Sequence, residues 1–287
     1  MNRIADFEAI GTHWNIDIDK KFDEGHLVEV MQRVMECIKD FDRTYSRFRP
    51  DSLVTQMSLR PGAYFLPDNA EPMMALYRRL YDMTDGAFTP LIGQLLSDIG
   101  YDAVYSLVSL EPIAPPAWDD VMEFRDSTLI VREPVLLDFG AGGKGYLVDL
   151  VAEILLVDGI DSFVVNAGGD IRVVGRAQKV GLEHPSNVEQ AIGIATFQNQ
   201  SICGSAGNRR KWGKFEHTID PRVLESPKHI LAVWVVAATT MLADALTTCL
   251  YFVTPEVLLA EFTFEYAIVS VDLSITVSAN FPAEFFS

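Results

Sequence analysis

Hydrophobic residues recur at helical spacing in four stretches of the chain. In each stretch, apolar side chains return every three or four positions, so that one stripe of a helix is apolar. The first stripe is long enough for a helix of about five turns. Asp68 is in position to cap the second helix, and T-D-G-A-F after it ends with a glycine stop. The four stretches are 27–45, 73–80, 147–155 and a helix that starts at Thr239 or Thr240 and runs to about Phe252.

Other stretches have the pattern of β-strands. Polar and apolar residues alternate over 11–18, which predicts a half-buried strand. Short strands are predicted at 128–131 and 135–138, a hairpin at 162–166 and 171–174 around A-G-G-D, and an apolar strand at 232–237. Helices and strands alternate irregularly, so an α+β (mixed α/β) fold is favoured over a doubly wound sheet.

A proline-rich segment marks the most plausible internal boundary. Residues 111–118 hold three prolines, which is typical of a boundary or of an ordered crossing loop. We therefore expect one structural unit over residues 1–287, with two subdomains that meet near 111–135 as the alternative.

The charge balance disfavours some classes of binding partner. The chain has 23 Lys and Arg against 40 Asp and Glu, a formal net charge of −17, and 49% of its residues are hydrophobic. This composition supports a packed core and excludes a disordered chain, while the acidic charge disfavours nucleic acid and anionic membranes as partners. An anionic ligand would need a metal, a helix N-terminus or local cations, for which Lys144, Arg209 and Arg222 are the candidates.

Cysteines and apolar runs give no sign of export or membrane insertion. Three cysteines without short spacing predict reduced thiols rather than a disulfide framework or a four-thiolate metal site. The N-terminus carries charges where a signal peptide needs its apolar core, and the longest nearly apolar run, 230–243, is too short to span a bilayer. A cytoplasmic protein without a membrane span is expected, with an exported protein trimmed of its leader as the alternative.

Two clusters suggest chemistry. D-F-G-A-G-G-K-G-Y-L-V-D begins at Asp138 and has neither the Walker nor the G-x-G-x-x-G spacing, but it leads into a helix whose N-terminal amides favour an anion. Asp244 and Thr248 of D-A-L-T-T are one helical turn apart and form an incomplete magnesium site. Together the clusters suggest a magnesium-assisted site for a nucleotide pyrophosphate. Taken singly, each has a structural alternative: a tight strand-to-helix turn, and a polar stripe on a buried helix.

Weaker candidates lie elsewhere. His217 could act as a general base near neutral pH, although most lone loop histidines are solvated bystanders. Phe48 and Phe88 could stack on a flat ring, although core packing is the commoner fate of a phenylalanine.

In order along nearly the whole chain, these segments resemble the ApbE family of flavin transferases, the FAD:protein FMN transferases. The resemblance rests on G-T-H-W-N-I, Y-S-R-F-R-P-D-S, T-D-G-A-F-T-P, D-F-G-A-G-G-K-G-Y-L-V-D, V-N-A-G-G-D-I-R-V-V-G, H-T-I-D-P-R and A-D-A-L-T-T. It implies an ApbE-like fold, with mixed or antiparallel sheets flanked by helices. The implied activity is transfer of FMN from FAD to a Thr or Ser hydroxyl of an acceptor protein, dependent on Mg²⁺, with release of AMP. Mn²⁺ is the alternative metal, because oxygen ligands accept both.

The resemblance also implies site residues. Catalysis would fall to Asp244, Lys144 and, ranked lower, His217. The implied metal ligands are the Ala141 carbonyl, Asp244 and Thr248, with Thr247 standing where some relatives have an additional carboxylate. The implied flavin and nucleotide contacts are Phe48, Ala87, Phe88, Thr89, Asp138, Lys144 and Ile219.

Two loops depart from the family pattern. Many relatives have T-S-G ahead of an arginine and P-R-T-G after I-D, where this chain has G-S-A at 204–206 and P-R-V-L at 221–224. Two alternatives to transfer therefore stay open: hydrolysis of FAD to FMN and AMP, and a flavin-binding module without catalysis. The acceptor protein and the oligomeric state are not predicted.

Overall fold

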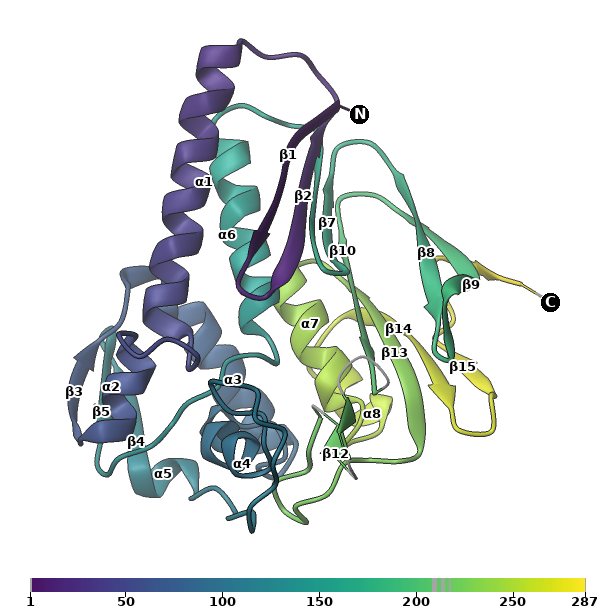
Figure 1. The fold of residues 1–287 in the computed structure, drawn as a ribbon. Helices are drawn as coiled ribbons and strands as arrows, with labels where there is room; N and C mark the ends of the chain where they lie inside the picture. Colours follow the sequence, from purple (N-terminus) through teal and green to yellow (C-terminus); the bar gives the residue numbers. More distant parts are fainter. Residues whose placement is uncertain (1, 208–210, 213–214, 217, 287) are drawn as a thin grey trace.

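The computed structural model describes residues 2–207, 211–212, 215–216 and 218–286. Its centre is an eight-stranded sheet in the order β1-β2-β6-β7-β10-β13-β14-β15, in which all neighbours are antiparallel (Figure 1). The α+β expectation, with antiparallel sheets flanked by helices, is confirmed. The strands are β1 (Asn2–Ala9), β2 (Thr12–Ile18), β6 (Phe163–Ala167), β7 (Asp170–Val174), β10 (Ser201–Ala206), β13 (Ile230–Ala237), β14 (Phe264–Ser270) and β15 (Ile275–Val277).

Three helices that carry predicted apolar stripes pack on this sheet. Helices α1 (Glu24–Tyr45) and α6 (Gly143–Val157) lie side by side, and α7 (Thr240–Cys249) follows near the lower end of α6 (Figure 1). Val34 of α1 and Val151 of α6 share one core with Trp14 of β2 and Phe163 of β6. Burial of such side chains is the main stabilising term of the fold.

A second body lies below α1 and contains short helices and a small sheet (Figure 1). Its three-stranded sheet has the order β3-β5-β4, and its core includes Tyr77, Phe88 and Leu129. The elements are α2 (Leu53–Leu59), β3 (Gly62–Phe65), η1 (Asp68–Ala70), α3 (Glu71–Met83), η2 (Pro90–Ile92), α4 (Gly93–Asp98), α5 (Trp118–Val121), β4 (Met122–Arg125) and β5 (Thr128–Val131).

A separate three-stranded sheet and a few short elements complete the fold. Strands β8 (Gln178–His184), β9 (Asn187–Phe197) and β16 (Ala283–Phe285) form a separate sheet. The short pair β11 (Lys211–Trp212) and β12 (Phe215–Glu216) and the helix α8 (Pro255–Leu259) complete the described elements. No helix in the described ranges is long and apolar enough to cross a membrane.

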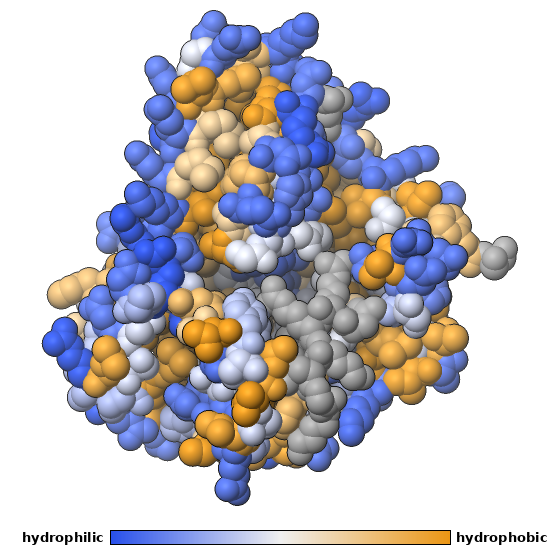
Figure 2. Space-filling view, in the orientation of Figure 1, coloured by the Kyte–Doolittle hydropathy of each residue, from blue (hydrophilic) through white to orange (hydrophobic). Residues whose placement is uncertain are grey.

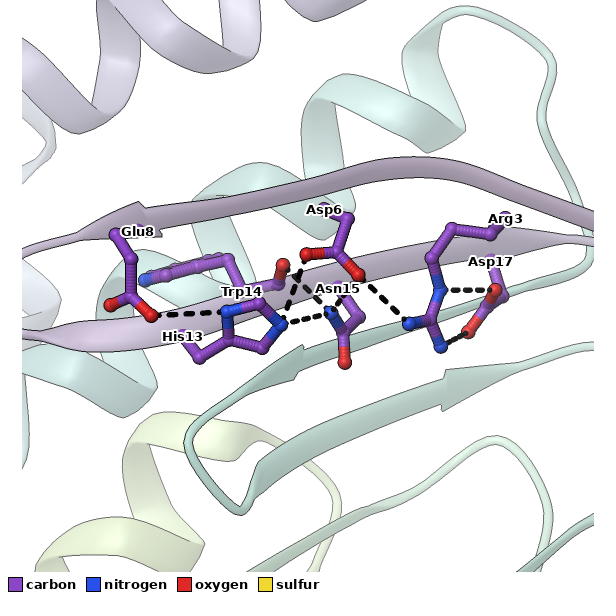
Figure 3. A network of polar contacts seen from close by, with 7 residues as sticks. All are labelled: Arg3, Asp6, Glu8, His13, Trp14, Asn15 and Asp17. Atoms are coloured by element: carbon purple, nitrogen blue, oxygen red, sulfur yellow. Dashed lines mark hydrogen bonds and ion pairs between the residues drawn. The ribbon is translucent and has the colours of Figure 1, made fainter.

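The predicted alternation at 11–18 is confirmed in the β1–β2 hairpin. Its polar side chains form one network, in which Arg3 pairs with Asp17 and Asp6, and His13 contacts Glu8 (Figure 3). Trp14 is fully buried in the core. One face of the hairpin therefore meets solvent while the other packs on the helices.

Three local predictions are wrong. Residues 135–138 do not form a strand: Val135 donates its N–H to Met57 O and Asp138 donates to Pro90 O, so this extended segment is bonded to helices and turns. Asp68 does not cap α3 but begins the 3-10 turn η1 before it. Helix α7 ends at Cys249 rather than near Phe252, while its predicted cap is confirmed at Thr239, whose side chain accepts from Leu242 N.

Candidate functional site

The glycine-rich turn forms the N-terminus of α6. Phe139 O accepts N–H bonds from Gly142 and Gly143, and Asp138 Oδ1 accepts from Gly140 N at 2.7 Å. The cap residue, Gly142, offers no side-chain hydrogen bond to the helix. No side chain of Gly142 itself therefore caps α6, and the positive end of the helix dipole at this turn favours an anion.

Helix α7 brings Asp244 against this turn. Gly145 N donates to Asp244 Oδ2 at 2.9 Å. A Cβ at position 145 would lie 2.4 Å from Thr240 O and 2.7 Å from Asp244 Cβ, so only glycine lets the two helices approach this closely. A Cβ at Gly142 would lie 3.3 Å from Ala245 Cβ. Two clusters about 100 residues apart in sequence are therefore in contact, since the bonded pair is separated by 99 positions.

The side chains beside this contact carry oxygen atoms that could coordinate a metal, and most of them are buried. Asp244 is 8% exposed, and burial raises the pKa of its carboxyl group, while Lys144 and the Gly145 N–H act in the opposite direction. Thr247 Oγ1 donates to Asp244 O at 2.7 Å, and Thr248 lies one helical turn after Asp244. The Tyr77 hydroxyl, close to Gly142, is buried and has no hydrogen-bond partner in the described part of the chain.

Carboxylate, hydroxyl and carbonyl oxygens such as these are the ligands that a hard divalent cation prefers. In the described ranges no three His, Cys, Asp or Glu side chains gather into a metal-binding group. Coordination would therefore combine Asp244 and Thr248 with the Ala141 carbonyl and with oxygens of water or a ligand phosphate, as Mg²⁺ sites commonly do. Among the described residues, the buried Tyr77 hydroxyl has no hydrogen-bond partner and the Asp244 carboxylate has one, which agrees with a bound polar group here.

Lys144 faces the β6–β7 turn. Its Nζ pairs with Asp170 Oδ2 and donates to Ala167 O at 3.3 Å. The predicted hairpin is confirmed, with Gly168 and Gly169 both at positive φ in a two-residue loop. Asp170, predicted only as part of that turn, pairs with Lys144 and holds it in place. The motif V-N-A-G-G-D was the available signal.

Asp149 fixes α7 relative to α6. Its carboxylate accepts N–H bonds from Thr240 at 2.9 Å and from Met241 at 2.8 Å, at the N-terminus of α7. Asp149 lies about one and a half helical turns after Lys144 on α6. The glycine-rich motif therefore leads into the acceptor that orients α7, the helix of Asp244.

Of the predicted flavin contacts, Phe48 and Ile219 lie in one cluster. Ile219 belongs to an apolar cluster with Tyr101 and Leu95, and Phe48 packs against this cluster. Arg47, absent from the predicted set although its motif was noted, has a buried side chain whose Nε donates to Asp138 Oδ2 at 2.5 Å. Through this pair the cluster joins the glycine-rich turn.

The side chains of the other predicted contacts are buried in the core or bonded to the backbone. Ala87 is 2% and Phe88 is 1% exposed, and the Phe88 ring packs on Tyr77 at 4.8 Å between centroids. Thr89 Oγ1 accepts from Leu91 N. The Phe88 ring is thus a core side chain.

The remaining candidates fall outside the described residues or make other contacts. His217 and Arg209 are outside the described residues. Arg222 pairs with Asp220 and donates to Thr84 O at 3.0 Å. Residues 204–206 lie inside β10, paired with β13, and 221–224 form a turn in which Leu224 N donates to Asp220 O.

Comparison with known proteins gives one consistent result. Three curated relatives are called FAD:protein FMN transferase. The one from Escherichia coli K12 is 21% identical to this chain, over 88% of the chain and 79% of the relative. The one from Haemophilus influenzae is 26% identical over 85% and 78%, and the one from Rhodobacter capsulatus is 28% identical over 60% and 36%.

Solved structures agree on the fold. The ApbE protein of Thermotoga maritima superposes with a TM-score of 0.84 at 20% identity, over 98% of this chain and 99% of that one. The flavin transferase ApbE of Vibrio cholerae gives 0.79 at 19%, over 96% and 97%. The model of the ApbE family matches residues 10–265. With this match over most of its length, the chain belongs to the ApbE family.

Proposed function

We propose that the protein is a FAD:protein FMN transferase that uses Mg²⁺ and moves FMN from FAD to a Thr or Ser hydroxyl of an acceptor protein. One observation carries the proposal: the bond from the Gly145 N–H to Asp244 joins the N-terminus of α6 to a buried carboxylate. The names of the relatives support the same activity.

The chemistry needs little covalent participation from the protein. The acceptor oxygen forms a bond to the phosphorus on the FMN side, the bond from that phosphorus to the AMP oxygen breaks, and the hydroxyl proton passes to a base. When bound, the divalent cation would neutralise charge on the pyrophosphate. Asp244, Thr248, Thr247 and the Ala141 carbonyl would hold it, while the positive end of the α6 dipole would favour the phosphates beside the turn.

The base is assigned by resemblance alone. His217 precedes I-D-P as the family's histidine does, and it falls outside the described residues. Lys144, paired with Asp170, contributes positive charge beside the turn without being free to move as a base.

The decisive experiment is a transfer assay. The protein is mixed with FAD, MgCl₂ and Thr-containing acceptor domains from flavinylated proteins, and FMN attachment is followed by in-gel flavin fluorescence with AMP release by chromatography. We expect a fluorescent acceptor band with equimolar AMP, lost with EDTA and in Asp244→Asn. AMP without a band, both with and without acceptor, would instead indicate hydrolysis. FAD binding without any AMP would indicate a non-catalytic module.

A further inference from the structure

The hydroxyl group of Tyr77, on α3, is buried in the core. The side chain is 0% exposed, and no atom in the described part of the chain forms a hydrogen bond with the hydroxyl. Hydrophilic residues cover much of the face shown in Figure 2, where water can satisfy them, but Tyr77 has no such access to water. A buried polar group without a partner is costly and rare, so this hydroxyl needs a physical explanation.

The packing around Tyr77 holds its side chain against the glycine-rich turn. The ring packs on Phe88 at 4.8 Å and meets Phe139 nearly edge-on at 5.2 Å between centroids. A Cβ at Gly142, the N-cap of α6, would lie 3.5 Å from the Tyr77 ring and 3.7 Å from its hydroxyl oxygen. Because other aromatic rings fix the Tyr77 ring, the hydroxyl stays beside the N-terminus of α6.

Two carboxylates of the candidate site act on this hydroxyl. Burial raises the pKa of the Tyr77 hydroxyl well above its ordinary value, and the charges of Asp138 and Asp244 act in the same direction. The hydroxyl therefore keeps its proton and is available as a hydrogen-bond donor. Neither carboxylate accepts a hydrogen bond from it. A ligand oxygen bound at the turn would supply the acceptor.

A second tyrosine offers a contrast. Tyr45, the last residue of α1, also has a buried hydroxyl for which the described residues provide no partner, and its ring also meets Phe139 edge-on, at 5.4 Å. Burial raises the pKa of Tyr45 as well, but the neighbouring group that adds to this effect is Tyr146 rather than an aspartate of the site. The two tyrosines share their burial and one neighbour, and they differ in which of them lies beside the charged groups of the site.

We propose that the Tyr77 hydroxyl donates a hydrogen bond to a phosphate oxygen of the pyrophosphate that binds at the glycine-rich turn. This inference rests on the proposed use of FAD and adds a donor from α3 to the groups that α6 and α7 supply. A neutral donor suits this position, because a hydroxyl can lie beside Asp138 and Asp244 without forming an ion pair with either. Donation to an ionised oxygen is also stronger than donation to a neutral one.

The test compares Tyr77→Phe with the matched control Tyr45→Phe, since each removes one buried hydroxyl oxygen next to the same ring. Inorganic pyrophosphate, ADP-ribose and FAD are titrated by calorimetry in MgCl₂, with riboflavin as the ligand that has no phosphate. We expect Tyr77→Phe to bind the phosphate ligands roughly ten-fold more weakly, because a hydrogen bond to a charged oxygen is lost. Its affinity for riboflavin should not change, and Tyr45→Phe should match the parent for every ligand.

Thermal unfolding separates this role from a structural one. Without ligand, both variants should melt at or above the temperature of the parent, because each loses a buried hydroxyl that has no partner. With MgCl₂ and ADP-ribose, the rise in melting temperature should be smaller for Tyr77→Phe than for the parent or Tyr45→Phe, because weaker binding stabilises the folded state less. If Tyr77→Phe instead melted below the parent without ligand, the hydroxyl would have a partner within the protein, and the proposal would be wrong.

Each contrary binding result has a separate meaning. Equal affinity of the parent and Tyr77→Phe for pyrophosphate would overturn the role of Tyr77 and leave the proposed function standing. MnCl₂ titrated alone is a further check, because an equal loss for the ion would assign the hydroxyl to water around the cation instead of a phosphate. A parent that binds pyrophosphate and ADP-ribose but not FAD would overturn the proposed function alone, and a parent that binds none of the phosphate ligands would overturn both.

Discussion

At the residue scale, the contact between Lys144 and Asp170 links the glycine-rich turn to the β6–β7 hairpin. Asp170 has a side chain only 3% exposed, whereas that of Lys144 is 27% exposed. Removing the cation would leave a buried carboxylate without its charge partner, which is far more costly than an exposed ion pair is stabilising.

We predict that Lys144→Met lowers the free energy of unfolding by about 2–3 kcal/mol, because Asp170 loses its partner. Asp170→Asn in the same chain should restore much of this loss. Urea unfolding of the two single variants and the double variant measures the coupling. Additive effects in this cycle would contradict a direct pairing.

Individual site residues were predictable to different degrees. The spacing of Asp244 and Thr248 at i, i+4 on one helix, and the position of the glycine-rich turn at a helix N-terminus, could be predicted because both depend on short-range sequence. The role of Arg47 could not, since nothing in its own segment indicates that Asp138, 91 positions away, would be its partner. Phe88 was proposed for stacking, but its burial against Tyr77 depends on packing that periodicity does not reveal.

At the element scale, α7 is oriented by two acceptors at its N-terminus. Thr239 caps it from within its own chain segment, and Asp149 does so from α6. Burial raises the pKa of Asp149, while the two N–H bonds lower it by less. A carboxyl group whose folded pKa is raised favours the folded state most when protonated, and that contribution is lost as pH rises through the folded pKa.

We therefore predict a pH-dependent difference between the parent and Asp149→Asn. The stability of the parent relative to this variant should be greatest near pH 4 and should fall as pH rises, because the unfolded aspartate ionises before the folded one. Asp149→Ala should show the same pH dependence and should be about 1 kcal/mol less stable than Asp149→Asn at each pH, because alanine cannot accept the cap hydrogen bonds. Denaturant unfolding from pH 4 to 8 checks both; a parent that gains stability over Asp149→Asn with rising pH would refute the assignment.

The elements themselves were predicted where periodicity was long or a turn was explicit. Helices α1 and α6, the β6–β7 hairpin and the strand at β13 follow from apolar spacing and from A-G-G-D. The segment 135–138 looked like a strand because an apolar run does not distinguish pairing with a strand from hydrogen bonds to turns. Strands β8, β9 and β14 were not predicted.

At the scale of the whole molecule, the sheet order joins segments far apart in the chain. Strand β2 pairs with β6, and β7 with β10, across long insertions. Such pairings depend on tertiary packing. The contact between the α6 turn and α7 could therefore be seen only in the structure. The resemblance to a family implied it; local pattern alone did not.

The net charge of −17 predicts an ionic-strength effect on ligand binding. Without divalent cations, FAD affinity should rise a few-fold as NaCl increases from about 20 to about 150 mM, because screening weakens repulsion of the anionic pyrophosphate. Riboflavin, which is neutral, serves as the control and should bind equally at both concentrations. Fluorescence titrations measure both; FAD affinity that falls with salt would show that local cations outweigh the global charge.

The central claim concerns where a divalent ion and a dinucleotide meet. Crystals soaked in FAD and MnCl₂ and measured at the manganese absorption edge locate the ion by its anomalous signal, since oxygen ligands that hold Mg²⁺ also accept Mn²⁺. We predict a peak bound by the Ala141 carbonyl, Asp244 and Thr248, next to the FAD pyrophosphate. A FAD-bound crystal with its manganese elsewhere, or with none beside Asp244, would contradict the account.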